Sequence, residues 1–155
     1  MTVSLASPAF EADQRVPDRF TCEGGNVSPP LTWSGAPPET RSFVLICSDP
    51  DAPAGTWYHW AVFDLPAERR SLEEGFPTDG RIGVIRQAVN DFGRTGYGGP
   101  CPPPGHGVHH YHFRLAALDV ETLTVAASPD CRDVEREMMQ HLVDETTLIG
   151  TFSRG

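Results

Sequence analysis

Residues 42–65, SFVLICSDPDAPAGTWYHWAVFDL, contain two apolar runs separated by a short segment rich in proline and acidic residues. Short runs rich in β-branched and aromatic residues predict β-strands when turn residues bound them, here at residues 42–48 and 57–65. The intervening DPDAPAG is typical of a loop. The stretch therefore predicts two strands with Asp49 and Asp51 at the end of the first.

The same alternation of apolar runs and turn signals recurs along the chain. Further predicted strands are TVSLAS at 2–7, LTW at 31–33 and HHYHFRLAAL at 109–118, with weaker candidates at 84–89 and 147–152. The 155 residues include 15 Gly and 15 Pro, which favours short strands over a helical bundle. Residues 67–107 are rich in loop signals, which indicates functional loops or a strand that the pattern misses.

One helix is predicted at residues 130–145, DCRDVEREMMQHLVDE. Asp130 and Asp133 resemble a capping box at its start. One helical face carries the apolar residues Cys131, Val134, Met138 and Leu142. We interpret this stripe as core packing and not as a cofactor site. With no repeat or linker, the chain is predicted to be a single domain, residues 1–155, mainly β: an antiparallel β-sandwich with one late α-helix.

The formal net charge is −9, and all 12 basic residues are arginine. This charge opposes binding to nucleic acid and to anionic membranes, so any anion must be held by a short-range pocket. No run approaches the roughly 20 apolar residues of a membrane span, and the start lacks a secretory pattern. We therefore expect a cytoplasmic protein without stable membrane insertion.

The four cysteines, Cys22, Cys47, Cys101 and Cys131, form no C-x-x-C pair, which disfavours a zinc knuckle or a thioredoxin motif. In a reducing cytoplasm we expect free thiols. Cys22 and Cys101 both lie in loops rich in Gly and Pro, and a disulfide between them is left open.

Strand alternation sorts the histidines by face. Strict alternation in WYHWAVF groups His59 with Trp57, Ala61 and Phe63. Both faces of this strand are largely apolar. The strand is therefore predicted to be central, with His59 at least partly buried.

In HHYHFRLAAL, His109 and Tyr111 share a face with apolar residues, whereas His110, His112 and Arg114 form the wetter face. We therefore predict that His109 points inward and that its two histidine neighbours point outward. Both inward histidines lie at strand ends beside proline-rich loops.

The second proline-rich loop, GPCPPPG at residues 99–105, has few backbone donors. The N–H of Cys101 lies between prolines, where pairing into a sheet is hindered. Because a buried N–H needs a partner, a ligand oxygen is a candidate. The alternative is that Asp49, Asp51 and Pro103 only build tight turns.

Three chemical hypotheses compete for these residues. Carboxylates and histidines can bind zinc, although His110 and His112 are better explained as a solvated face. A Cys101–His109–Asp49 triad would need a thiol wedged between prolines, and no G-x-S-x-G elbow is present. An anion or zwitterion pocket uses every part of the cluster, because imidazoles and backbone N–H groups hold phosphate.

The motifs DPDAP, W-x-H-W and GPCPPPGHGVHHY closely resemble the phosphatidylethanolamine-binding protein family, in its bacterial Raf kinase inhibitor-like branch. NVSPPLTWSG and NDFGRTGYGGP are also similar to the family, so the resemblance runs from about Cys22 to Asp119. It implies a β-sandwich with a small pocket at strand ends for phosphate-type head groups. The matching positions are Asp49, Asp51, His59, Pro103, His109 and Tyr111, with Cys101 where the family offers a backbone N–H.

Two features depart from the family pattern. His110 stands where the family often has arginine, which leaves the pocket intact if this residue faces outward. The chain ends at TFSRG, without the longer C-terminal segment of eukaryotic members. The resemblance therefore does not establish kinase regulation.

We predict a binding protein without enzymatic activity, cofactor or metal, for a phospholipid head group, a phosphorylated small molecule or a phosphorylated side chain. Asp49 is expected to orient His59 or to accept a cationic head. His59, His109 and the Cys101 N–H hold the anion, and Trp57, Pro103 and Tyr111 wall the site.

The alternative function is inhibition of a kinase or protease through the pocket loops, and a metal-dependent hydrolase is the third hypothesis. A homodimer is an open possibility. The sequence does not identify the ligand.

Overall fold

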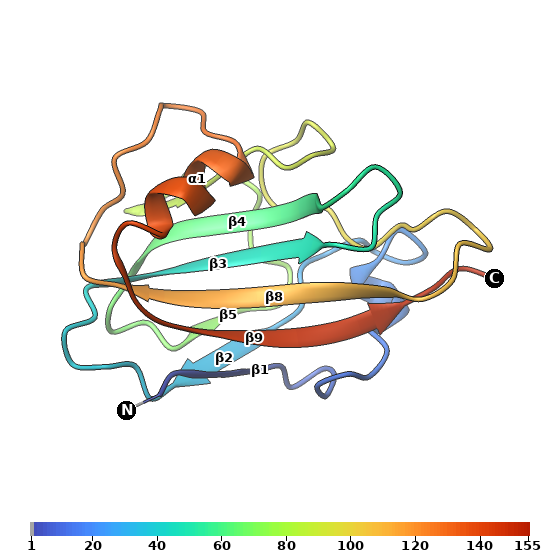
Figure 1. The fold of residues 1–155 in the computed structure, drawn as a ribbon, viewed down its shortest axis with the longest axis horizontal. Coiled ribbons are helices and arrows are strands. Elements are labelled where there is room, and N and C mark those ends of the chain that lie inside the picture. The colour runs from blue at the N-terminus through green and yellow to red at the C-terminus, as the bar shows by residue number, and fades with distance from the viewer. Residues whose placement is uncertain (1) are drawn as a thin grey trace.

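Residues 2–155 of the computed structural model form two antiparallel β-sheets packed face to face, with one α-helix on the outer face of the larger sheet (Figure 1). The larger sheet has the order β6-β7-β4-β3-β8-β9. Its strands are β3 (Ser42–Asp49), β4 (Trp57–Pro66), β6 (Arg81–Ile82), β7 (Ile85–Gln87), β8 (His109–Leu118) and β9 (Leu142–Phe152). The smaller sheet has the order β1-β2-β5, with β1 (Ser4–Ala6), β2 (Leu31–Ser34) and β5 (Ser71–Leu72). The helices are the 3-10 helix η1 (Asp18–Phe20) and α1 (Cys131–Met138).

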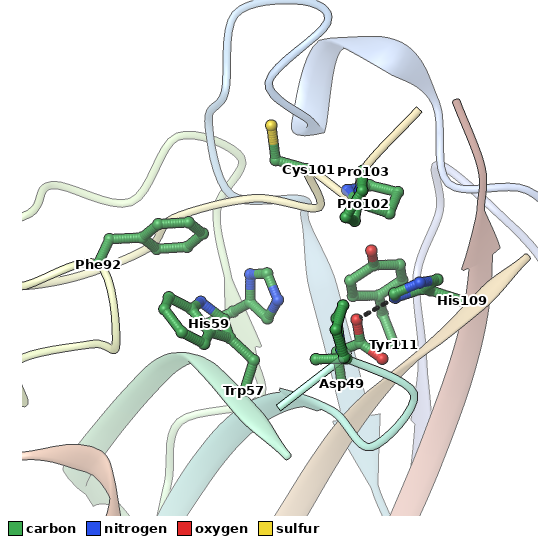
Figure 2. A pocket seen from close by; sticks show the side chains of 11 residues that line it. Asp49, Trp57, His59, Phe92, Cys101, Pro102, Pro103, His109 and Tyr111 are labelled. Carbon is green, nitrogen blue, oxygen red and sulfur yellow. Dashed lines mark hydrogen bonds and ion pairs between the residues drawn. The ribbon is translucent and has the colours of Figure 1, made fainter. Parts of the chain in front are cut away.

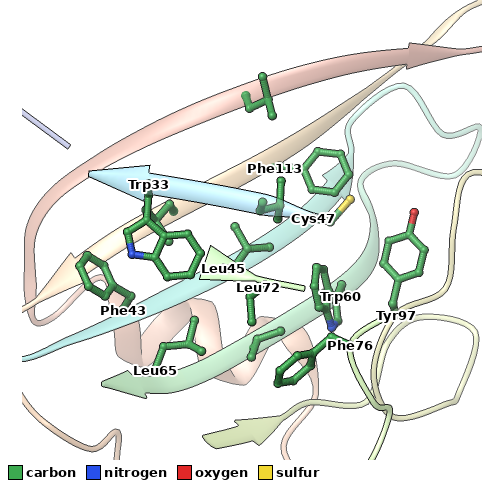
Figure 3. Packing of buried hydrophobic residues seen from close by; sticks show 14 of the residues in the cluster. Trp33, Phe43, Leu45, Cys47, Trp60, Leu65, Leu72, Phe76, Tyr97 and Phe113 are labelled. Carbon is green, nitrogen blue, oxygen red and sulfur yellow. The ribbon is translucent and has the colours of Figure 1, made fainter. Parts of the chain in front are cut away.

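Alternation along β3 creates the two apolar layers. Phe43, Leu45 and Cys47 pack between the sheets, whereas Val44 and Ile46 pack under α1. Figure 3 shows the inter-sheet layer, which also contains Trp33, Trp60, Leu72 and Phe113. Burial of each large apolar side chain contributes about 1.5–3 kcal/mol. The predicted mainly β sandwich with a late helix is therefore confirmed.

The predicted helix at 130–145 is wrong at its C-terminal end. Its capping box is present, because Asp130 accepts the Asp133 N–H and the Asp133 side chain accepts the Asp130 N–H. The helix nevertheless ends at Met138, and Leu142 begins β9. β9 pairs with β8 along the whole length of β8, so sheet pairing overrides the apolar pattern that suggested a longer helix. The weak strand candidate at 147–152 is the end of this strand.

The strict alternation predicted for β4 is also wrong. Cys47 pairs with Trp60 and the next residue, Ser48, pairs with Tyr58, so His59 is an extra residue in a β-bulge. A bulge inverts the alternation beyond it. Ala61 therefore packs under α1, whereas His59 reaches the cavity at the end of the sandwich.

Cys22 and Cys101 form a disulfide across 79 positions of sequence, whereas Cys47 and Cys131 are buried free cysteines. The expectation of free thiols is therefore wrong for the first pair. Disulfides are typical of oxidising compartments, so the bond does not favour the cytoplasmic location, which stays a prediction. Neither helix in residues 2–155 is long and apolar enough to cross a membrane.

Candidate ligand-binding site

A cavity of about 200 Å³ lies where β3 ends and where β4 and β8 begin (Figure 2). These three strand ends meet because β3 is antiparallel to both neighbours. Loops before β4 and β8 complete the walls. The lining residues are Asp49, Ala52, Pro53, Trp57, His59, Phe92, Cys101, Pro102, Pro103, His109 and Tyr111.

Asp49 and His109 form a buried hydrogen-bonded pair, with exposed fractions of 3% and 2%. The Nδ1–H of His109 donates to Asp49 Oδ2 at 2.5 Å, and the N–H of Asp51 donates to Asp49 Oδ1 at 2.8 Å. Both oxygens of the carboxylate therefore have donors. We expected Asp49 to orient His59 or to accept a cationic head, but the carboxylate orients His109.

The other ring nitrogen of His109 contacts a residue that the sequence analysis did not select. Nε2 of His109 lies 2.6 Å from Nδ1 of His106, in the loop before β8. The loop itself is closed by the His106 N–H, which donates to Pro103 O at 3.1 Å. A hydrogen-bonded chain thus runs from buried Asp49 through His109 to exposed His106. A ligand that bonds to His109 Nε2 must displace His106.

His59 is buried beside the cavity and bonds to the segment before Cys101. Its Nδ1–H donates to Gly98 O at 2.7 Å, and the Gly98 N–H donates back to His59 O at 3.0 Å. The tautomer is therefore fixed with Nδ1 protonated, which leaves Nε2 as the other ring nitrogen of a residue that lines the cavity (Figure 2). Burial lowers the pKa of this imidazole. The ring is neutral at pH 7, with Nε2 as an acceptor.

Tyr111 lies between the two imidazoles on the inward face of β8. Its ring meets His59 edge to face at 5.3 Å and stacks with His109 at 6.3 Å. Burial raises the pKa of its hydroxyl, so this group stays protonated. The hydroxyl points toward the loop of Pro102 and Pro103 (Figure 2) and can donate a hydrogen bond.

Aromatic side chains form the wall opposite His109. Phe92 meets both Trp57 and His59 edge to face, each at 5.4 Å. Phe92 lies in the segment NDFGRTGYGGP and was not predicted as a site residue, because a single aromatic residue in a loop has no periodic pattern. The side chain is 43% exposed, so it also forms part of the rim.

The loop over the cavity is fastened at several points. Cys101 is bonded to Cys22, and the Cys22 N–H donates to Pro100 O at 3.0 Å. Arg154 donates to Pro102 O at 3.3 Å. Because the Cys101 sulfur is already bonded, a triad with Cys101 as nucleophile lacks its thiol. The Cys101 N–H donates to no backbone or side-chain group of residues 2–155.

Asp51 does not line the cavity. Its carboxylate accepts the N–H and the Nδ1–H of His110, both at 2.8 Å, and the hydrogen bond from this side chain lowers the pKa of Asp51. Asp51 and His110 are both exposed, as predicted for His110. Among residues 2–155, no three His, Cys, Asp or Glu side chains are grouped to hold a metal ion.

The remaining predicted site residues all lie in the cavity lining, and their part in ligand binding stays a prediction. They are Asp49, Trp57, His59, Cys101, Pro103, His109 and Tyr111. The residues that sequence reasoning missed are Ala52, Pro53, Phe92 and Pro102 in the lining and His106 behind His109.

Comparison with known proteins relates this chain to one family over nearly its whole length. The family described as phosphatidylethanolamine-binding protein matches residues 6–153. A UPF0098 protein of Aquifex aeolicus is 45% identical over 152 residues, which cover 98% of this chain and 89% of that protein. A UPF0098 protein of Methanothermobacter thermautotrophicus is 46% identical over 155 residues, covering 99% of this chain and all of that protein.

A solved structure shares the fold over the full length of both chains. It is the crystal structure of Escherichia coli YbcL, described as a new member of the mammalian PEBP family. The TM-score is 0.94 and the sequence identity is 32%, with 100% of each chain covered.

Proposed function

The chain belongs to the phosphatidylethanolamine-binding protein family, and from this premise we propose that its cavity binds small phosphate-bearing or zwitterionic head groups without changing them chemically. The observation that carries the proposal is the convergence of proton-bearing and proton-accepting groups on one space. His59 Nε2, the His109 ring and the Tyr111 hydroxyl come from two strands. A phosphate monoester that carries one proton matches such a set, because its oxygens accept hydrogen bonds and its P–OH group can donate one to the His59 lone pair.

The electrostatics of the cavity tolerate an anion despite the overall charge of −9. The carboxylate lining the cavity, Asp49, is already compensated by the donors from His109 and Asp51. Burial keeps His59 neutral, and a phosphate monoester has a second pKa of about 6. One proton shared between the imidazole and the phosphate therefore completes the hydrogen bond.

The walls favour a small head group over a free inorganic ion alone. Trp57, Phe92 and Pro103 offer apolar and aromatic surfaces beside the polar floor. An aromatic face also attracts a cationic ammonium group. An ethanolamine or similar cation attached to the phosphate would therefore find a partner at Trp57 or Phe92.

Calorimetric titration with phosphoethanolamine tests the proposal. His59→Ala is expected to weaken binding by about 1.5–3 kcal/mol, the usual contribution of a hydrogen bond to a charged group. His112→Ala is the matched control, because His112 lies on the other face of β8 and outside the cavity lining. Equal affinities for the wild type and His59→Ala would refute a site at this cavity.

Inhibition of a kinase or protease through the cavity loops stays the alternative. It predicts that a captured enzyme loses activity while direct titration with phosphoethanolamine gives no heat of binding.

A further inference from the structure

A second cavity, of about 210 Å³, adjoins the head-group cavity. The two cavities share Phe92 and Cys101 as lining residues. The second is also lined by Asn26, Arg94 and Gly99. The two cavities are therefore neighbours, with the exposed residues Phe92 and Cys101 at their common boundary.

Arg94 is an exposed residue that lines the second cavity. Among residues 2–155 no carboxylate lies within ion-pair distance of its guanidinium, whereas most other arginines have such a partner. Its backbone is held in a tight turn, since the Asn90 N–H donates to Arg94 O at 2.7 Å and Asn90 Oδ1 accepts the Arg94 N–H at 3.2 Å. The side chain thus starts from a fixed position.

Asn26 adds a neutral donor to the same cavity. Its Oδ1 accepts the Gly99 N–H at 2.8 Å, which fixes the orientation of the amide and leaves the Nδ2 group as its free end. The Tyr97 hydroxyl, another lining group, is already donating to Phe20 O at 2.7 Å. Asn90, which also lines this cavity, is already satisfied, because its Nδ2 donates to Gly96 O at 2.8 Å and its Oδ1 accepts the Phe92 N–H at 2.9 Å. The two side chains without such partners, Arg94 and Asn26, are both donors and one is charged, a combination that binds a carboxylate.

We propose that the second cavity is an anion subsite, and that the two cavities together select small phosphorylated carboxylic acids. The phosphate binds at His59 and His109, and the carboxylate binds at Arg94 and Asn26. This inference rests on the proposed function, because it takes the phosphate site in the first cavity as its starting point. It adds that a phosphate alone uses only part of the site.

Two matched ligand pairs test the subsite, one with a short and one with a long distance between the phosphate and the carboxylate. O-phosphoserine differs from phosphoethanolamine by one carboxylate, and 6-phosphogluconate differs from glucitol 6-phosphate by a carboxylate in place of a hydroxymethyl group. The readout is the ratio of Kd values within each pair, from calorimetry at low ionic strength. In the wild type, the carboxylate should strengthen binding about fivefold to tenfold in at least one pair, or about 1–1.4 kcal/mol.

Variants show which residue carries the gain. Arg94→Gln should bring the ratio to about one, and Asn26→Asp should do the same, because it keeps an oxygen for the Gly99 N–H but replaces the amide donor with a charged acceptor. Arg81→Gln is the charge-matched control, since Arg81 lies on β6 and lines neither cavity. It should leave the ratio unchanged.

The outcomes separate this inference from the proposed function. If phosphoethanolamine binds but neither pair shows a gain from the carboxylate, the subsite is wrong and the head-group site stands. Persistence of the gain in Arg94→Gln would also overturn the subsite. If none of the four phosphates binds, both proposals fail together.

Discussion

Binding of a phosphate at His59 should require one proton, and this requirement gives a measurable pH dependence. The Nδ1–H of His59 is fixed on Gly98 O at 2.7 Å, so the neutral ring presents only a lone pair to the cavity. Burial lowers the pKa of His59 below its ordinary value of about 6.5. Above pH 7 the free ring is neutral and the free phosphate is mainly a dianion. Two acceptors then face each other unless a proton enters with the ligand.

The size of the change in Kd with pH follows from the uptake of one proton. Each pH unit above 7 should weaken binding tenfold, or about 1.4 kcal/mol, because the required proton becomes tenfold scarcer. Between pH 7 and 8.5 the Kd for phosphoethanolamine should therefore rise about thirtyfold. Below pH 6 the phosphate carries its own proton, so the affinity should level off.

His59→Gln removes the requirement while keeping a donor. The amide NH₂ of glutamine can donate to a phosphate oxygen without taking up a proton, so the Kd should stay constant from pH 7 to 8.5. Calorimetry at fixed ionic strength, in two buffers with different heats of ionisation, measures both the Kd and the number of protons. A constant Kd in the wild type would refute the argument. The same slope in His59→Gln would show that the proton does not bind at His59.

Three further predictions concern the supports of the cavity. Asp49→Asn removes the charge that accepts the His109 Nδ1–H at 2.5 Å, so it should lower the free energy of unfolding in urea by about 1–3 kcal/mol and weaken phosphoethanolamine binding. A variant with the stability and the affinity of the wild type would contradict this. Reduction of the Cys22–Cys101 disulfide, which joins residues 79 positions apart, should lower the free energy of unfolding by about 2–5 kcal/mol in the same urea assay. An unchanged urea midpoint in dithiothreitol would show that the bond does not constrain the chain. Asp130→Ala removes the cap of α1 and should lower the free energy of unfolding by about 1 kcal/mol. The phosphoethanolamine Kd should stay unchanged, because α1 packs on the face of the large sheet away from the sandwich interior, and a changed Kd would show coupling through the sheet.

The strands were predictable where their side chains alternate regularly between the two faces of the sheet. In β8, buried and more exposed residues alternate from His109 to Arg114, and the predicted strand has the observed bounds, His109–Leu118. The helix start was predictable because Asp130 and Asp133 form a local motif. The helix end was not, because residues 139–149 contain no glycine or proline and Leu142 continues the apolar pattern. Pairing of β9 with β8, a non-local interaction, decides that boundary.

The two acids of the first motif show why site prediction from sequence was incomplete. Asp49 and Asp51 flank Pro50 almost symmetrically in sequence, and nothing local distinguishes them. The difference is that Asp49 is the last residue of β3 and is buried, whereas Asp51 lies in the loop and bonds to exposed His110. His109 and His59 were identifiable because both lie near the start of a recognisable strand.

Two of the features that the sequence pattern did not predict, the bulge at His59 and the Cys22–Cys101 disulfide, shape the cavity. The bulge at His59 inserts one residue so that this ring and Trp60 both remain on the sandwich side of β4. The disulfide fastens Cys101 over the cavity in a segment where prolines leave few backbone donors for pairing. Sites that depart from local rules are often the functional ones, since their cost must be offset by the rest of the fold. Strand ends and a covalent bond hold the cavity walls in place before any ligand binds, so binding should cost little entropy for ordering the protein. Selectivity among phosphates then depends on which ligand groups reach His59, Phe92 and the second cavity.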